Sequence, residues 1–229
     1  NILGRYGADG AQLTEILETS REQSGGAISL TIGGDDDFAG NFTVLPDERV
    51  VVYQKAQEYK LEIFAPDGSP QRIIRRDYDS LRRTDEDLEE ARELAAELAA
   101  RFGGDDDDGV QEYEQDISRV VARADGELWV LSSRGLRGCP AGHLGVFDVF
   151  DPDGRFVRTL RIAADFDPDD DRFLVVGDRL YVFKQALNAP DRNFSGGGGA
   201  MVMVVAGREE DEDDGEEPMP FEVICYRLP

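Results

Sequence analysis

Three segments of this chain repeat one pattern, and this repetition constrains the fold more than any other feature of the sequence. PDERVVVY (residues 46–53), ADGELWVL (124–131) and VGDRLYVF (176–183) align without a gap. In each copy, an acidic or glycine-containing turn is followed by the β-branched and aromatic residues that favour strands. The chain is therefore predicted to consist of successive copies of one strand unit.

Each copy extends on both sides into a longer unit. An apolar run precedes every turn, at residues 42–45, 117–122 and 173–176, so each unit is predicted to begin as a hairpin. A third strand follows and closes on Phe-x-Pro-Asp-Gly in the first two units, where Pro and Gly favour a tight turn. Fourth strands are predicted after these turns, at residues 70–76 and 155–162.

The third unit is less regular. We expect its third strand at residues 200–206 (AMVMVVA) and its fourth at 221–228 (FEVICYRL), with an acidic loop between them. The neighbouring Gly196, Gly197, Gly198 and Gly199 are interpreted as a flexible connection, because no strand-to-helix context with a following Lys-Ser or Lys-Thr makes them a phosphate-binding loop.

Four antiparallel strands repeated along a chain are typical of the blades of a β-propeller. An antiparallel sandwich also alternates short strands and turns, but it does not require each set of four strands to begin with the same hairpin. We expect an all-β propeller fold, with three to four blades in this chain and one inserted amphipathic helix. The predicted parts are a partial blade with connecting loops (1–40), a blade (41–83), a helix with an acidic loop (84–109), a second blade (110–163) and a third with Gly-rich and acidic loops (164–229).

Three units do not close a ring, which takes about four to eight blades. Residues 1–7 and the strand at 27–34 (AISLTIGG) are assigned to a preceding partial blade. Three explanations stay open: further blades precede residue 1, another chain supplies them, or the sheets close in a different way.

Two longer stretches carry a resemblance to a known family. DGELWV followed by FDVFDPDGRFVRTLRI, and YKLEIFAPDGSPQRIIRRDYD followed by an acidic helix, resemble the six-bladed β-propeller proteins of bacteria related to NHL-repeat propellers, over roughly residues 41–185. The resemblance implies six blades. It also implies an extracytoplasmic location, periplasmic, at the cell surface or lipid-anchored. The shared motifs are turns and strands, so no catalytic residue is carried over.

The segment between the first two units predicts one amphipathic helix over residues 84–104. Thr84 and Asp87 form a capping-box-like start, apolar residues recur at helical spacing from Leu88 to Phe102, and Gly103 ends the helix. The helix is expected to pack against the edge of a sheet, and a docking surface for a partner is compatible with that position.

Charge excludes several classes of partner. The chain has 49 acidic and 25 basic residues, a net charge of −24, which repels nucleic acid and anionic membranes. No apolar run reaches the roughly 18 residues that span a bilayer. The acidic runs at 105–108 and 209–217 are predicted to be solvated loops.

One acidic cluster has the spacing of a metal site. Asp165, Asp167, Asp169 and Asp171 alternate in DFDPDDD, and Ca²⁺ favours several carboxylates that converge from a turn. The cluster departs from the EF-hand pattern, because Asp170 stands where glycine is required. An exposed acidic turn is the alternative interpretation.

The remaining candidates for chemistry are single residues. Cys139 and Cys225 could form one disulfide in an oxidising compartment, but we expect two thiols. His143 is the only histidine and is expected in a loop, because Cys139 and His143 alone cannot complete a zinc site. Trp129 is expected in the core.

These observations favour a noncatalytic binding or scaffold module. It would be an exported or envelope-associated subunit of a larger assembly, with a protein partner, no catalytic residue and no resident cofactor other than the Ca²⁺ considered above. The alternative is a metal-dependent propeller hydrolase or lactonase, with acidic and amide side chains from several blades holding a metal on the central channel.

Overall fold

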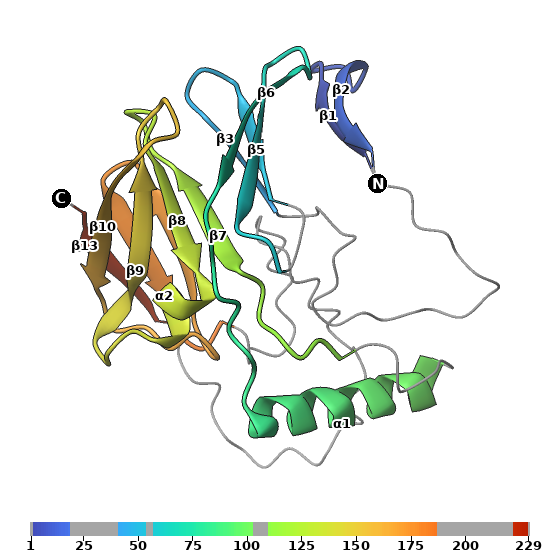
Figure 1. The fold of residues 1–229 in the computed structure, drawn as a ribbon, viewed down its shortest axis with the longest axis vertical. Coiled ribbons are helices and arrows are strands. Elements are labelled where there is room, and N and C mark those ends of the chain that lie inside the picture. The colour runs from blue at the N-terminus through green and yellow to red at the C-terminus, as the bar shows by residue number, and fades with distance from the viewer. Residues whose placement is uncertain (1, 19–40, 54–56, 103–109, 187–221, 229) are drawn as a thin grey trace.

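The computed structural model describes residues 2–18, 41–53, 57–102, 110–186 and 222–228. These residues form four antiparallel sheets and two helices, so the chain is all-β apart from α1 and the short α2 (Figure 1). Among the described residues, no helix combines the length and apolar character needed to cross a bilayer.

The strands fall into sheets in chain order. The first sheet contains β1 (Ile2–Tyr6) and β2 (Gln12–Glu18). The second contains β3 (Phe42–Val44), β4 (Val50–Val52), β5 (Lys60–Phe64) and β6 (Pro70–Arg75). The third contains β7 (Ile117–Ala122), β8 (Leu128–Ser132), β9 (His143–Phe150) and β10 (Phe156–Ala163). The fourth contains β11 (Arg172–Val176), β12 (Arg179–Phe183) and β13 (Val223–Arg227).

The second and third sheets confirm the predicted four-stranded units. In both, each strand pairs with the next along the chain, as a simple up-and-down meander. The inserted helix α1 (Asp85–Phe102) lies between them in sequence, and α2 (Ser133–Arg137) connects β8 to β9.

The prediction for the fourth sheet was wrong in one respect. β13 was expected as a fourth strand, but it pairs directly with β12, with Leu180 opposite Tyr226. Its alternate residues explain the position, because Ile224, Tyr226 and Leu228 pack into the same core cluster as Leu180. Residues 200–206, the expected third strand, lie outside the described residues, as do 27–34, the acidic runs and Gly196–199.

The first sheet repeats the last hairpin of the complete units. Its turn has the same hydrogen bonds as those after β5 and β9, with Gly10, Gly68 and Gly154 each donating to the carbonyl three residues earlier, at 2.8–2.9 Å. All three glycines have positive φ, at 80°, 82° and 72°. The turn between β7 and β8 has the same bond at Gly126, so the sequence makes the assignment. Residues 6–10, 64–68 and 150–154 share an aromatic-x-x-Asp-Gly pattern, which aligns β1 and β2 with the third and fourth strands of a unit.

Successive sheets stack face to face, with a core between each pair. β8 illustrates the arrangement: Leu128 and Val130 point into the core shared with the second sheet, whereas Trp129 and Leu131 point into the core shared with the fourth. On β4, Val50 and Val52 face the first sheet and Val51 faces the third. Both faces of the two middle sheets are thus buried, as continuous apolar strands require.

The first strands of the units lie on one side of the stack. β3 lies against β7, and Arg119 on β7 donates from Nη1 to the carbonyl of Phe173 on β11 at 2.6 Å. The stack therefore has an inner side formed by first strands and an outer side formed by fourth strands.

The two ends of the sheets differ in their connections. Tight turns join first to second and third to fourth strands at one end, at the top of Figure 1. Residues 76–102, 110–116, 133–142 and 164–171 lie in longer connections at the opposite end, which we call the loop face. Helix α1 runs away from the sheets at this end (Figure 1).

Candidate functional site

The loop face is the candidate site, because connecting segments on a rigid scaffold are where binding residues concentrate. Its first element is a stalk that carries α1. Arg82 and Tyr113 form an isolated antiparallel bridge, flanked by hydrogen bonds from Arg83 N to Glu112 O (2.9 Å) and from Glu114 N to Leu81 O (2.8 Å). These bonds join the two ends of the insertion, so α1 projects from a closed base.

The predicted capping box of α1 is confirmed. Thr84 N donates to Asp87 Oδ2 at 2.9 Å, and Asp87 N donates to Thr84 Oγ1 at 3.1 Å. The Thr84 hydrogen bonds lower the pKa of Asp87, which keeps a carboxylate at the positive end of the helix. Leu88 is buried and anchors this first turn. Leu88 is the one buried side chain among those described on α1, and the expected packing of the helix against a sheet edge stays a prediction.

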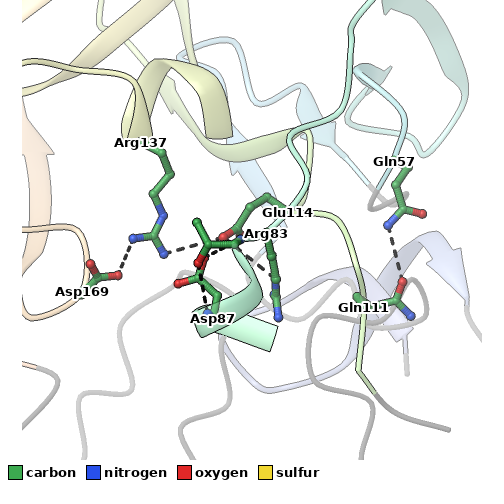
Figure 2. Close-up of polar contacts among 8 residues, drawn as sticks. Gln57, Arg83, Asp87, Gln111, Glu114, Arg137 and Asp169 are labelled. Carbon is green, nitrogen blue, oxygen red and sulfur yellow. Dashed lines mark hydrogen bonds and ion pairs between the residues drawn. The ribbon is translucent and has the colours of Figure 1, made fainter. Parts of the chain in front are cut away.

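An ion-pair network at the base of α1 joins three parts of the chain (Figure 2). Arg137 of α2 pairs with Asp169 in the connection before β11, and with Glu114 at 3.7 Å. Arg83, on the other strand of the stalk, lies 3.9 Å from Glu114. Although burial opposes its charge, Asp169 and Glu114 raise the pKa of Arg137. The network fixes the stalk to the third and fourth sheets.

A second set of contacts joins α2 to the residues just before the stalk. Tyr78 Oη lies 3.0 Å from Ser133 Oγ and accepts a hydrogen bond from Arg134 N at 2.9 Å. The Arg134 side chain pairs with Asp79 Oδ2 at 2.7 Å and also donates to the carbonyl oxygens of Asp79 and Ser80. This guanidinium thus binds the segment that leaves the second sheet.

A groove of about 600 Å³ opens beside this junction. Its lining residues are Gln57, Tyr78, Asp79, Ser80, Val110, Gln111, Glu112 and Tyr113. They include two carboxylates, two amides and two phenols but no cation, so the groove offers hydrogen-bond acceptors and aromatic surface. Gln57 Nε2 lies 3.5 Å from Gln111 Oε1, between the two walls (Figure 2).

One buried carboxyl lies next to the groove lining. Asp116 is 1% exposed, hydrogen bonds with Ser80, and leaves Oδ1 without a hydrogen-bond partner among the described residues. Burial raises its pKa. Asp116 supports the groove wall from beneath through Ser80.

The four predicted calcium ligands do not converge. Asp171 is buried and accepts hydrogen bonds from Lys184 Nζ (2.6 Å), Asp167 N (2.8 Å) and Gln185 N (2.9 Å). Asp169 pairs with Arg137, as described above, and Asp165 is exposed with Lys184 Nζ 3.7 Å away.

Two hypotheses on metals are affected by this arrangement. Over the described parts of the chain, no three His, Cys, Asp or Glu side chains are placed to hold one ion. The calcium site and the channel-metal hydrolase both stay predictions. The aspartates lie in a turn in which Lys184 contacts Asp171 and Asp165.

The remaining single-residue predictions have mixed outcomes. Trp129 is buried in the core, as expected, and donates from Nε1 to Glu127 Oε2 at 3.0 Å. Cys139 and Cys225 are both free thiols. His143 was expected in a loop, but it is the first residue of β9, where pairing with Ala163 extends the strand.

Sequence reasoning missed both arginines of α2, because their partners lie 23 to 56 residues away in the chain. The helix itself had a local signal: Ser132 Oγ accepts from Gly135 N at 3.1 Å as an N-cap.

Comparisons with known proteins supply no further assignment. Neither a scan against profiles of known protein families nor a search of curated proteins found a match. The class of protein therefore rests on the structure: an all-β chain of stacked antiparallel units with a loop face at one end.

Proposed function

We propose that this chain is an arc of a β-propeller that acts as a noncatalytic binding or scaffold module in a larger assembly. The successive four-stranded meanders, stacked face to face with their first strands on one side, support the propeller geometry. Six blades and an extracytoplasmic location are part of this proposal and rest on the family resemblance.

The observation that carries the binding function is the groove on the loop face. Its lining of Tyr, Gln and carboxylate side chains suits an extended peptide segment that contains Lys or Arg. Tyr113 is 39% exposed in this groove, and tyrosine is enriched among residues that dominate interfaces. The net charge of −24 would steer a cationic segment toward the surface.

A peptide array tests this function. Labelled wild-type protein is screened against unstructured peptides of varied Lys and Arg content, and Kd is then measured for retained peptides. We expect Tyr113→Ala to weaken binding about tenfold. Higher salt should weaken it further, because the attraction is partly electrostatic.

The matched control is Phe156→Ala. Phe156 is 54% exposed at the turn end of the third sheet, so its loss should leave peptide binding unchanged. Retention of no peptide, or equal binding by Tyr113→Ala and wild type, would contradict the proposed function.

A further inference from the structure

The fourth sheet has one buried and one open face. Phe173, Leu180 and Val182 pack against the third sheet. On the opposite face, Leu174 and Val223 are 49% and 44% exposed. No described residue covers these apolar side chains.

The open face is equivalent to a face that is buried one sheet earlier. In the repeat, Tyr181 takes the place of Trp129, and Cys225 takes the place of Val149; the two pairs have the same cross-strand register. Trp129 and Val149 are buried because the fourth sheet covers them. Tyr181 and Cys225 present the same surface without a covering sheet.

Arg172, on the open face of the fourth sheet, corresponds to Arg119 on the third sheet. Arg119 bonds the Phe173 carbonyl of the next sheet, and its guanidinium lies 4.6 Å from the centre of the Phe173 ring. Arg172 occupies the equivalent position on β11. Among the described residues, its guanidinium has no hydrogen-bond or ion-pair partner. The expected occupant therefore offers a first-strand carbonyl or another acceptor.

The other end of the stack has the complementary open face. Tyr6 precedes the turn of the first sheet, as Phe64 and Phe150 precede the turns of the second and third. Phe64 and Phe150 face the preceding sheet and are 9% and 4% exposed, whereas Tyr6 is 51% exposed. The chain thus presents both sides of the sheet-to-sheet contact that it uses internally.

We infer that a second copy of this chain stacks its first sheet on the open face of the fourth sheet. The contact is heterologous, since it joins two different surfaces, and such contacts close into rings when the stack curves. The gathering of first strands on one side gives the stack a curvature of that kind. Two copies would supply eight sheets, within the range of propeller rings, and such a ring would stand in place of the six blades that the family resemblance implies. The inference rests on the proposed propeller repeat and is independent of the groove ligand.

The net charge of the chain predicts how self-association depends on salt concentration. Two chains of net charge −24 repel each other, and salt screens this repulsion while leaving the apolar contact intact. Rising salt should therefore strengthen self-association, whereas it should weaken peptide binding at the groove. Failure of one proposal can thus be distinguished from failure of the other.

Sedimentation equilibrium of the full chain tests the inference. The wild type should reach at least twice the chain mass of 25.3 kDa as concentration rises. Leu174→Asp and Tyr6→Asp should each weaken association about tenfold or more, because each places a carboxylate in the contact. Val157→Asp is the matched control, since Val157 on β10 is also 49% exposed but lies on neither terminal sheet. Circular dichroism checks that all variants are folded.

Mixing the two interface variants makes the test specific for a heterologous contact. Each variant keeps one intact surface, so an equimolar mixture should regain one wild-type interface and associate, although neither variant does so alone. A contact between two identical fourth sheets would not be restored by mixing.

The thiol of Cys225 supplies a second readout. Both proteins carry Cys139→Ser, so that Cys225 is the only thiol. Maleimide labelling of Cys225 should slow with rising concentration in the protein with an intact interface, and should stay fast when Leu174→Asp is added. A chain that stays monomeric up to about 100 µM would overturn the inference, since that is far above the Kd of a specific interface. So would a mixture that does not associate, or a monomer whose Cys225 is already protected.

Discussion

At the scale of single residues, Asp148 is a buried carboxylate that joins two sheets of the stack. This carboxylate of the third sheet accepts a hydrogen bond at 2.9 Å from Tyr59, which precedes β5 of the second sheet, and pairs with Arg76, which follows β6. Asp148 and Tyr59 are 6% and 2% exposed. The contact raises the pKa of Tyr59 far above its ordinary value, with burial as the main cause and the Asp148 charge as the second. Asp148 therefore fixes the register of one sheet on the next.

Removal of the Asp148 carboxylate should be costly. Asp148→Ala leaves the buried Tyr59 hydroxyl without a partner, so we expect a loss of about 1–3 kcal/mol in the free energy of unfolding. Asp148→Asn keeps an acceptor and should lose less. Asp153→Ala, at an exposed turn, serves as the control with almost no loss. Urea unfolding measures all three, and equal stability of Asp148→Ala and wild type would refute the role.

Asp171 predicts how stability depends on pH. Burial opposes its charge, but the hydrogen bonds from Lys184, Asp167 N and Gln185 N lower its pKa. A pKa lower in the folded than in the unfolded state stabilises the fold above the unfolded value of about 3.9, and this contribution is lost as pH falls through the folded value. Asp171→Asn should thus be less stable than wild type at pH 7, with a difference that shrinks as the pH falls below about 4. A constant difference would argue against this assignment.

One turn residue, Glu48, has a backbone conformation that strains any residue with a side chain. Glu48 has a φ of 66°, at the turn position that Gly10, Gly68, Gly126 and Gly154 occupy elsewhere. Glu48→Gly should therefore gain about 0.5–1 kcal/mol relative to Glu48→Ala, since both variants lose the exposed ion pair with Arg5 and only glycine relieves the strain. Thermal unfolding compares the pair, and no gain for glycine would contradict the argument.

At the scale of elements, α1 depends on its cap more than on packing. Thr84→Ala removes the acceptor for Asp87 N and should destabilise the helix by about 1 kcal/mol. Hydrogen exchange of the α1 amides should quicken, while exchange in β8 stays unchanged, because the cap acts on the helix and β8 is buried in the third sheet. Glu89→Ala, at an exposed helical position, is the control. Equal quickening in β8 would mean that helix and sheets unfold together.

The elements that sequence reasoning identified are those with local signals. The turn at Asp67 and Gly68 and the capping box of Thr84 depend on neighbouring residues, so the local sequence pattern was sufficient to predict both. The placement of β13 was wrong, because strand order depends on which face of Ile224 and Tyr226 meets the core, and residues 200–206 offered a nearer apolar run. The groove and the network of Arg137 were missed, since both join residues far apart in sequence.

At the scale of the whole molecule, separate cores between successive sheets define the stack. A sandwich of the same strands would instead bury one face of each sheet in a single core. In the stack, neighbouring residues of β8 serve different cores: Val130 meets the second sheet, and Leu131 meets the fourth. This division is the property that distinguishes a propeller arc from its competitor.

Nuclear Overhauser effects between assigned methyl groups measure this division directly. We expect contacts from Val130 to Leu61 or Ile63, and separate contacts from Leu131 to Leu180 or Val182. Contacts that join Leu61 directly to Leu180 would place the second and fourth sheets in one core and would contradict the stacked arrangement.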